Sequence, residues 1–407
     1  MRASGKRLLY SKVMRLDLTS VQAALAEDNL DGWLLYDFRG INPIATRLAA
    51  VGGRGHMATR RWYYLVPRSG APRGLVHAIE RNNLAHLPGD IRTYTHRESL
   101  SQSLDWLLGG LSRIAMEYSA GCANPYLSRV DAGTVEAVRS RGLEIVSSGD
   151  LAQRFDGRWD DAAIVTHRRA SDILYDVKDR AFAEITRRLA DGVPTTEFDI
   201  QQLMVGWFGE TGLIAEDAPN VSAQENAGNP HYSPTAEHHR PIRKNEVVLL
   251  DLWGRLSTPS AVFADITWMG FSGPVVPDEV ANAFRTAAEA RDAAVALVHQ
   301  RVRAGLDVRG WEVDRAARGV LERAGYGAQI WHRTGHSLGE EAVHGNSVHM
   351  DDYETHDERR LLPGTGFTIE PGLYFPHFGV RTEINLVVTA DDAPVTGPLQ
   401  DRVLTLA

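Results

Sequence analysis

The 407-residue chain has 43% hydrophobic and 24% charged residues and a formal net charge of −8, ordinary proportions for a globular protein with two domains. The acidic balance argues against nucleic acid or an anionic membrane surface as a partner. No run approaches the roughly 20 apolar residues of a membrane span, and residues 1–10 lack the apolar segment of a signal peptide. The single cysteine, Cys122, excludes an intrachain disulfide and predicts a buried thiol in a reducing compartment. We therefore expect a cytoplasmic protein.

Strand patterns alternate with helix patterns over the first part of the chain. The predicted strands are Gly32–Tyr36, Arg61–Val66, Gly74–Ile79, Ile114–Tyr118 and Leu143–Val146, and the predicted helices are Thr19–Leu30, Leu100–Leu111 and Ser128–Arg141. Between them, the glycine-rich stretch Gly52–Met57 lacks the lysine and spacing of a phosphate-binding loop, which predicts a plain loop. This alternation predicts a mixed α/β domain over residues 1–157.

The second part, residues 158–407, repeats one layout. A long helix is predicted at Ser171–Leu189 and again at Pro277–Val302. Each is followed by a shorter helix bracketed by glycines at one separation, 192 and 212 in the first half and 305 and 325 in the second. Each half then leads to a predicted hairpin. Residue identity between the halves is slight, so on layout alone an accidental match stays open.

Each predicted hairpin carries two carboxylates within apolar strand runs. The first has Asp251 and Asp265, and the second has Glu370 and Glu383. Alternation along the last strand places Arg381 and Glu383 on one face. Buried carboxylates that converge on one point repel each other unless a cation lies between them, and hard divalent metals fill that role. The alternative for either aspartate alone is a hydrogen-bonded carboxylate at a strand end.

Histidines accompany these hairpins. His332, His336 and His344 cluster beside glycines just before the second hairpin, and His231 precedes the first. A neutral imidazole binds Zn, Mn, Fe or Co, which makes His336 the candidate metal ligand. His349 and His377 are expected to be surface residues or residues that support the site.

Taken together, these residues resemble the pita-bread metallopeptidase family that contains methionine aminopeptidase, prolidase, aminopeptidase P and the non-metal enzyme creatinase. The positions that match its dinuclear metal ligands are Asp251, Asp265, His336, Glu370 and Glu383. The positions that match its further catalytic residues are His231, His332, His344 and Arg381. The resemblance covers about residues 230 to 385. It implies an α+β pita-bread catalytic domain with a pseudo-twofold internal repeat, preceded by an α/β N-terminal domain.

The resemblance also implies a mechanism. Two divalent metal ions (Mn, Co, Zn or Fe, with Mn favoured) would share a hydroxide that attacks the carbonyl carbon of a short peptide or small amide. Glu370 would accept the proton of the water and pass it to the leaving amine. His344 would stabilise the tetrahedral species, and His231 would orient the substrate or donate to the leaving nitrogen. Arg381 and His332 would complete the polar rim. A homodimer is implied, with the loop 51–56 of one chain narrowing the site of the other.

Three functions stay open at this point. The first is a peptidase acting next to proline, of the Xaa-Pro dipeptidase or aminopeptidase type. The second is a creatinase-like C–N hydrolase of a small non-peptide substrate, and the third is a non-catalytic binding module on the same fold. The sequence departs from the family where Trp253 replaces a glycine, Trp268 a common arginine, and Gly345 an acidic residue. We expect the two tryptophans to narrow the pocket in favour of short substrates, unless both rings pack into the core.

Overall fold

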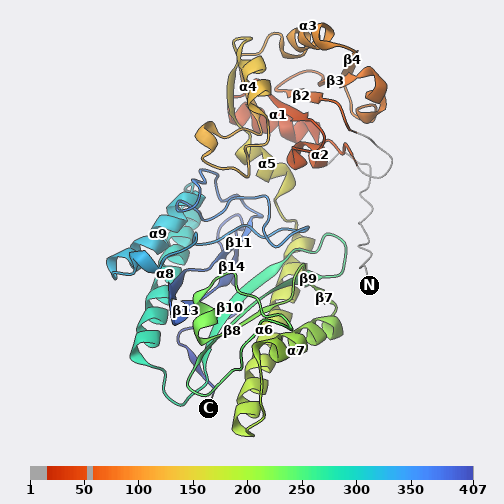
Figure 1. Cartoon of the computed structure of the whole chain (residues 1–407). Coiled ribbons are helices and arrows are strands. Elements are labelled where there is room, and N and C mark those ends of the chain that lie inside the picture. The colour runs from red at the N-terminus through yellow and green to blue at the C-terminus, as the bar shows by residue number, and fades with distance from the viewer. Residues whose placement is uncertain (1–15, 53–57, 407) are drawn as a thin grey trace. The chain divides into compact units, whose positions relative to one another are not determined.

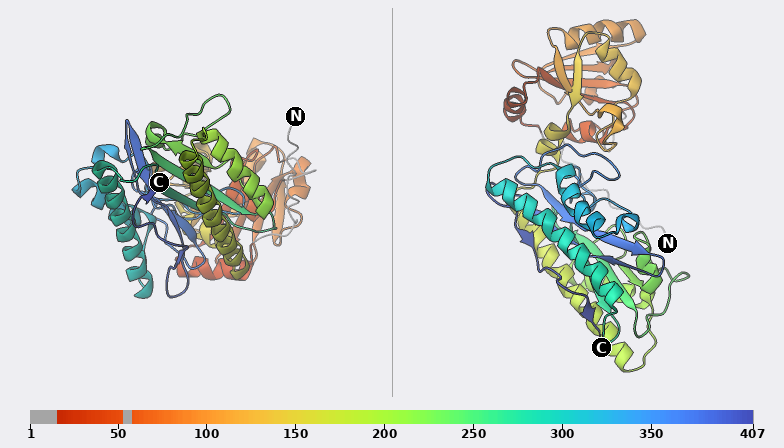
Figure 2. Two further views of the ribbon diagram at one scale, coloured as in Figure 1. Left: turned by 90° about the horizontal axis from the view of Figure 1, so that it is seen from below. Right: turned by 90° about the vertical axis from the view of Figure 1, so that its left-hand side faces the viewer.

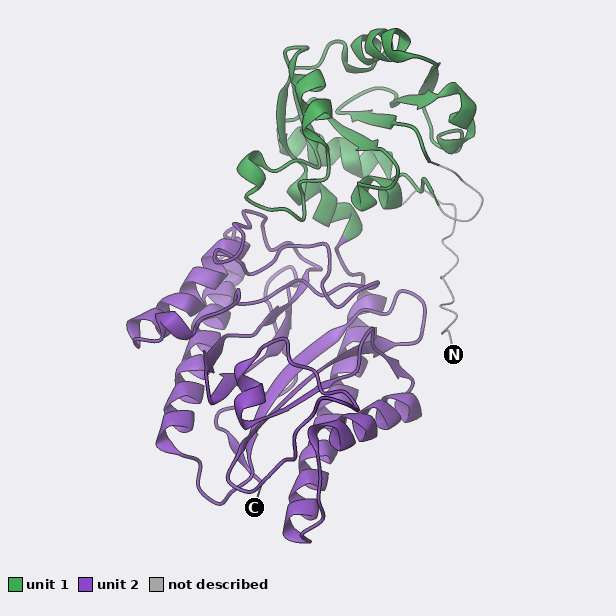
Figure 3. Ribbon diagram, in the orientation of Figure 1, with its two compact units in different colours: residues 1–156 green, residues 157–407 purple. Residues whose placement is uncertain are grey.

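The computed structural model describes residues 16–52 and 58–406. The chain divides into two compact units, residues 1–156 and 157–407 (Figure 3). Most of the predicted loop 52–57 and all of the N-terminal stretch 1–10 lie outside the described residues. Within the described ranges, no helix is both long and apolar enough to cross a membrane.

The first unit is built on a six-stranded sheet in the order β4-β3-β2-β1-β5-β6. Its strands are β1 (Gly32–Asp37), β2 (Trp62–Pro67), β3 (Arg73–His77), β4 (Asp90–Tyr94), β5 (Arg113–Met116) and β6 (Glu144–Ser147). Its α-helices are α1 (Leu18–Glu27), α2 (Pro43–Leu48), α3 (Arg97–Leu108), α4 (Ala132–Arg139) and α5 (Gly149–Asp156). The expected mixed α/β architecture is therefore present, with β4, α2 and α5 as elements that the sequence patterns did not predict.

Strand alternation gives this sheet two apolar faces. Trp33 and Leu35 of β1 pack with α1, α2 and α5, whereas Leu34 and Tyr36 pack with α3 and α4. Helices thus cover both faces (Figure 1). The prediction of a buried cysteine was wrong, because Cys122 is exposed at the end of the short 3-10 helix Ala120–Cys122, with φ of 54°.

The second unit contains two helix pairs. The first pair is α6 (Asp161–Ala190) and α7 (Glu197–Thr211), and the second is α8 (Asp278–Arg303) and α9 (Gly310–Arg323). The four predicted glycines all adopt positive φ, between 66° and 88°, just beyond the ends of these helices. Figures 1 and 2 show the two pairs on opposite sides of the strands of this unit. The expected helix–helix–hairpin layout therefore occurs twice.

The strands of the second unit form three sheets. One has the order β16-β10-β9-β7 with β8 also paired to β9, another the order β11-β14-β15, and the third pairs β12 with β13. The strands are β7 (Leu213–Ile214), β8 (Asn220–Ala223), β9 (Val247–Leu256), β10 (Ala264–Phe271), β11 (Gly366–Ile369), β12 (Gly372–Phe375), β13 (Phe378–Arg381), β14 (Ile384–Val387), β15 (Val395–Thr396) and β16 (Leu404–Thr405). One face of the central β9–β10 pair belongs to the apolar cluster that includes residues of α6 and α7, and the other face to the cluster that includes residues of α8 and α9.

The two faces of β9 and β10 differ in character. Even-numbered residues, such as Leu250 and Ile266, pack on α6 and α7. The odd-numbered face is apolar at one end, where Leu249 and Met269 pack with α8 and α9. The same face turns polar from Asp251 onwards. A polar strip inside a packed unit is costly unless its groups have partners, so this strip marks the candidate site.

His167 links α6 to this core. Its Nδ1 lies 2.8 Å from the Phe263 carbonyl oxygen, and its Nε2 lies 2.9 Å from Thr396 Oγ1. A neutral ring satisfies both contacts when Nδ1 donates to the carbonyl and Nε2 accepts from the hydroxyl. Burial accordingly lowers the pKa of His167 to about 4.

This lowered pKa predicts a loss of stability in mild acid. Between about pH 6.5 and 4 the unfolded chain binds a proton at His167 that the folded chain does not, so stability falls as the pH falls through that window. His167→Gln keeps hydrogen-bonding groups but removes the titration. Lowering the pH from 7 to 5 should reduce the free energy of unfolding of both proteins. The reduction should be about 2 kcal/mol smaller in the variant than in the parent. Urea unfolding at both pH values measures this, and parallel losses in parent and variant would contradict it.

Candidate metal centre

The first two predicted ligands lie on the polar strip of β9 and β10. The antiparallel register pairs Asp251 with Thr267 and Asp265 with Trp253, so all four side chains lie on one face. Asp265 is buried, and its backbone N–H donates to Asn385 Oδ1 at 3.0 Å. The hairpin thus presents both aspartates to the strands of the second half.

The second pair of carboxylates comes from two nested hairpins. The sequence predicted one hairpin carrying Glu370 and Glu383, but the strands break at these residues. Glu370 lies between β11 and β12, and Glu383 between β13 and β14, while β11 pairs with β14 through Ile369 and Ile384. Antiparallel pairing therefore still brings the two glutamates to the same place in the fold. Arg381 ends β13 rather than sharing a strand with Glu383.

Thr267 joins these side chains, and sequence reasoning missed it. Its hydroxyl donates to Glu383 Oε2 at 2.7 Å and lies 3.2 Å from Asp251 Oδ1. Arg381 Nε donates to the same hydroxyl at 2.9 Å, and its Nη2 pairs with Asp251 Oδ2. Burial alone would lower the Arg381 pKa, but Asp251 and the other carboxylates outweigh it and raise this pKa. The only signal for Thr267 was its place two residues after Asp265, on the same face.

His336 is oriented for coordination. Its Nδ1 lies 3.0 Å from the Ser337 carbonyl oxygen, which makes Nδ1 the protonated nitrogen and leaves a lone pair on Nε2. That Nε2 lies 3.5 Å from Asp265 Oδ2 and 3.5 Å from Glu370 Oε1. Burial lowers the His336 pKa, against the opposing pull of Glu370. The ring is therefore held in the neutral form that binds metals.

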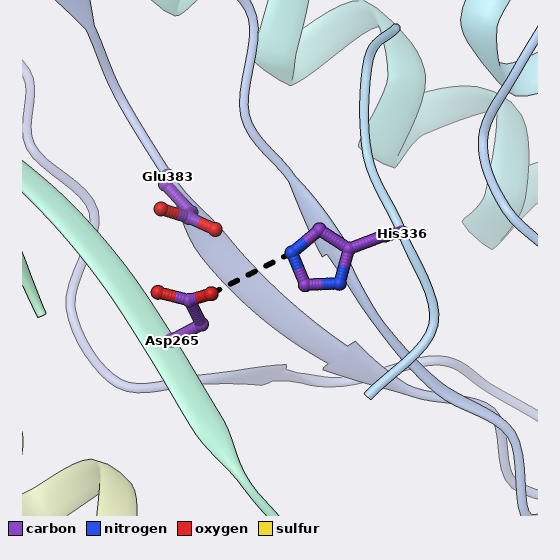
Figure 4. Close-up of side chains that lie close together, drawn as sticks. All are labelled: Asp265, His336 and Glu383. Carbon is purple, nitrogen blue, oxygen red and sulfur yellow. Dashed lines mark ion pairs between the residues drawn. The ribbon is translucent and has the colours of Figure 1, made fainter. Parts of the chain in front are cut away.

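Three of these groups offer ligand atoms that all lie within 4.8 Å of one another: Asp265, His336 and Glu383. Figure 4 shows their side chains converging from three segments of the chain, with the Asp265–His336 pair marked. Glu370 adjoins the group through His336, and Asp251 adjoins it through Thr267. The five predicted ligand positions thus form one contiguous cluster.

The chemistry of the cluster fits a divalent cation. Asp265 Oδ1 and Glu383 Oε1 are buried and have no hydrogen-bond partner among the described residues. Burial, followed by the neighbouring carboxylates, raises the pKa of both groups well above their usual ranges. Unpaired buried carboxylate oxygens cost free energy, and a hard cation removes that cost. Carboxylates with one imidazole are a donor set suited to Mn, Fe, Co or Zn.

A polar network borders the cluster. His332 Nδ1 lies 2.6 Å from the Arg333 carbonyl oxygen, so Nε2 accepts the hydrogen bond of the Tyr374 hydroxyl at 2.7 Å. Arg381 Nη1 donates to the same hydroxyl at 3.4 Å. Burial, then Arg381, lowers the His332 pKa to about 4. Tyr374 was not among the predicted site residues, although its place on the strand after Glu370 was a signal.

The other predicted histidines occupy different environments. The ring of His344 lies next to that of His336, with centroids 4.2 Å apart and the ring planes tilted by 55°. Burial is the main cause that lowers the His344 pKa to about 3, and the neighbouring Arg333 guanidinium lowers it further. His231 is exposed, and its backbone N–H donates to Asn229 Oδ1. Both rings therefore belong to the surroundings of the cluster, but neither is among the residues whose ligand atoms converge.

His349 and His377 were expected to be either surface residues or residues that support the site, and the structure contains one of each kind. His349 is buried, and its Nδ1 accepts from the Ser337 backbone N–H at 3.1 Å, next to His336. His377 is exposed and lies 3.3 Å from Glu279. His349 thus supports the segment that carries His336, and His377 is a surface residue.

Trp253 and Trp268 lie on opposite faces of the β9–β10 pair. Trp268 faces away from the aspartates, is 7% exposed and packs against α6, where the Lys178 Nζ lies 3.9 Å from its ring centroid. The expectation that Trp268 narrows the pocket was wrong, because residues 265 and 268 lie on opposite faces of one strand. Trp253 shares the face of Asp265 and is partly buried beside Phe263 and Leu338.

The packing of Trp268 on α6 predicts that its replacement affects stability and not substrate preference. Trp268→Phe should lower the free energy of unfolding by about 1–2 kcal/mol, because it leaves a void and weakens the contact with Lys178. It should leave the ratio of kcat/KM for a dipeptide to that for a longer peptide unchanged. Urea unfolding and steady-state kinetics measure both quantities. A shifted ratio at unchanged stability would show that the ring does reach the pocket.

The comparisons with known proteins agree with this geometry. The sequence pattern of metallopeptidase family M24 matches residues 166–390. The chain belongs to metallopeptidase family M24. The probable dipeptidase PepE of Mycobacterium tuberculosis is 26% identical to it over 401 residues, covering 96% of each chain. The Xaa-Pro dipeptidase of Lactobacillus helveticus is 33% identical over 178 residues, covering 42% of each chain.

Solved structures show the same fold. The crystal structure of dipeptidase PepE from Mycobacterium ulcerans has a TM-score of 0.64 and 22% identity to this M24 chain, and the match covers 98% of this chain and 99% of that one. Other structures with this fold are prolidases and an aminopeptidase P. The predicted pita-bread fold with an α/β N-terminal domain is therefore confirmed, as is the predicted resemblance.

Proposed function

We propose that the protein is a dinuclear metal-dependent peptidase that cleaves Xaa-Pro bonds in short peptides. The observation that carries the proposal is the pair of buried carboxylate oxygens that have no hydrogen-bond partner among the described residues, beside the lone pair of His336. We assign the metal ligands to Asp251, Asp265, His336, Glu370 and Glu383. Two divalent ions, with Mn favoured, would supply an activated water and polarise the scissile carbonyl group.

In this proposal, the side chains Glu370, Thr368 and His344 carry out proton transfer and stabilise the oxyanion. Glu370 accepts a proton from the attacking water and delivers it to the leaving amine, because it combines a ligand position with partial exposure. Thr368 Oγ1 lies 3.2 Å from Glu370 Oε1 and holds this carboxylate in place. The lowered pKa of His344 keeps its ring neutral, so it donates a hydrogen bond to the developing oxyanion without carrying a charge.

The outer residues bind and orient the substrate. His231 is exposed beside His344, where it reaches the substrate or the leaving nitrogen. Arg381 neutralises Asp251 and fixes the hydroxyl of Tyr374, which in turn fixes His332. We assign these residues to the polar rim that aligns the scissile amide. Rigid alignment of this kind contributes to catalysis by reducing the entropy lost in reaching the transition state.

Preference for short peptides rests on two observations. The relatives include proteins named dipeptidase and Xaa-Pro dipeptidase. Trp253 also places a bulky ring on the face that carries both aspartates. With the reducing environment that a single cysteine fits, we place this activity in the cytoplasm.

A substrate panel tests the proposal. Purified protein with added Mn²⁺ is given Xaa-Pro dipeptides, dipeptides without proline, longer Xaa-Pro peptides, and small N-methyl or amidine compounds. Xaa-Pro dipeptides should give the highest kcat/KM. Preferred turnover of the N-methyl compounds would replace the proposal with a creatinase-like C–N hydrolase. An absence of turnover across the panel would favour a non-catalytic binding module.

We further propose a homodimer in which the N-terminal unit of one chain narrows the site of the other. The support is that the described residues of the first unit contribute no ligand atom to the cluster, although they form a six-stranded sheet of their own. Light scattering at micromolar concentration should give twice the mass of the chain. A fully active monomer at that concentration would contradict this arrangement.

A further inference from the structure

A second polar site lies at one edge of the sheet in the first unit. The strand register aligns Asp37 with Trp62 and His77 with Tyr94 at this edge. β1 and β3 both run antiparallel to β2, and β4 runs parallel to β3, so the carboxyl ends of β1, β3 and β4 meet here. In α/β sheets, ligands bind at the edge where parallel strands end.

An open depression of about 690 Å³ lies at this edge, a size that suits a small organic ligand. Among the described residues, its lining contains four arginines and two histidines and no aspartate or glutamate. The basic residues are Arg39, Arg60, Arg61, Arg97, His77 and His96. A chain of net charge −8 therefore gathers a strongly cationic pocket in its first unit.

Two of these four guanidinium groups have no counter-ion in the part of the chain that the structure describes. Among the described residues, no carboxylate forms an ion pair with Arg39 or Arg61, and both residues are exposed. Arg97 pairs with Glu98 at 3.2 Å in a largely exposed contact. The Glu80 carboxylate accepts from the backbone N–H of Arg60, so it offsets part of the charge on that side. The charge left over is concentrated at Arg39 and Arg61.

The pocket also has apolar walls. Phe38 is 39% exposed and adjoins Arg39, while Tyr94 and Leu100 are buried below the cavity surface. A guanidinium group matches phosphate oxygens with two parallel hydrogen bonds, and an exposed phenyl ring offers a surface for a flat ring system.

We propose that this pocket binds a small organic phosphate, with the phosphate group between Arg39 and Arg61 and its ring against Phe38. The site lies wholly within the first unit and does not depend on the proposed peptidase activity. It gives the N-terminal unit a ligand of its own.

Calorimetric titration of the full-length protein tests the proposal, with adenosine 5′-monophosphate and inorganic phosphate as the two probes. The nucleotide should bind saturably and more tightly than inorganic phosphate. Arg39→Ala and Arg61→Ala should each weaken nucleotide binding about tenfold. The matched control is Arg68→Ala, in the same unit just beyond the opposite end of β2, which should leave binding unchanged. Phosphate held at a metal centre would persist in all three variants, so only the difference between them reports on this pocket.

Each outcome of this titration either supports the anion site or overturns it. Circular dichroism confirms that the arginine variants fold, which is expected because both side chains are exposed. Equal affinity of the nucleotide and inorganic phosphate, with weakening in both arginine variants, would support the anion site but assign it to free phosphate. The proposal would be overturned by unchanged binding in Arg39→Ala and Arg61→Ala, or by no saturable binding at concentrations on the order of 10 mM.

Discussion

Asp265→Asn should strongly reduce Xaa-Pro dipeptide hydrolysis and lower the metal content of the protein. The aspartate is buried among Glu370, Glu383 and Asp251, and its Oδ1 has no partner among the described residues. Asparagine keeps the shape of the side chain but removes the charge that a divalent cation needs. We expect kcat/KM to fall on the order of 10³-fold, because the metal contributes several kcal/mol of charge stabilisation. Elemental analysis and steady-state kinetics measure the two effects.

The same variant should be more stable than the parent once metal is removed. Without a cation, the parent buries converging carboxylates that raise each other's pKa, and the neutral amide relieves this cost by about 1–2 kcal/mol. Asp172→Asn, at an exposed position of α6, is the matched control and should change neither activity nor stability. Full metal content and turnover in Asp265→Asn would remove Asp265 from the ligand set.

His231→Ala and His344→Ala should keep their metal but lose most of kcat. Neither ring is among the described side chains whose ligand atoms converge, although the ring centroids of His344 and His336 lie 4.2 Å apart. General acid–base and oxyanion contributions are each worth about 10²–10⁴-fold in rate, so losses of that order are expected. His377→Ala removes an exposed histidine beside Glu279 and should leave kcat unchanged.

Metal analysis of the two histidine variants decides their roles. Full occupancy with reduced kcat supports catalytic residues outside the coordination sphere. Loss of metal in His344→Ala would instead make this residue a ligand. Unchanged kcat in both variants would leave the proposed mechanism without its acid–base partners.

The sequence patterns predicted the architecture well because the main elements have strong local signals. The helices of the second unit end at glycines with positive φ, and the strands of the first unit are short apolar runs between turns. β4 was missed because Asp90–Tyr94 is largely exposed and polar, so its sequence lacks an apolar run. Helix α2 is six residues long, too short to show a helical period.

The directions of the side chains at the site were harder to predict from the sequence than the secondary structure. The positions of Asp251 and Asp265 implied that neighbouring tryptophans would share their pocket, yet Trp268 packs on α6 because it lies an odd number of residues from Asp265. The breaks in the strands at Glu370 and Glu383 depend on the pairing of β11 with β14, a contact between segments distant in sequence. Thr267 and Tyr374 were missed for the same reason, since their partners come from other segments.

The most direct test of the claim that the protein is a dinuclear metal-dependent peptidase is a titration of the metal-free protein with Mn²⁺. Calorimetry measures the binding of the metal, and Xaa-Pro dipeptide hydrolysis measures the activity. We expect no hydrolysis before metal is added, and activity that rises and saturates at two ions per chain. Hydrolysis that persists in excess chelator would contradict the account, as would saturable binding of two ions that leaves the protein inactive towards every peptide in the panel.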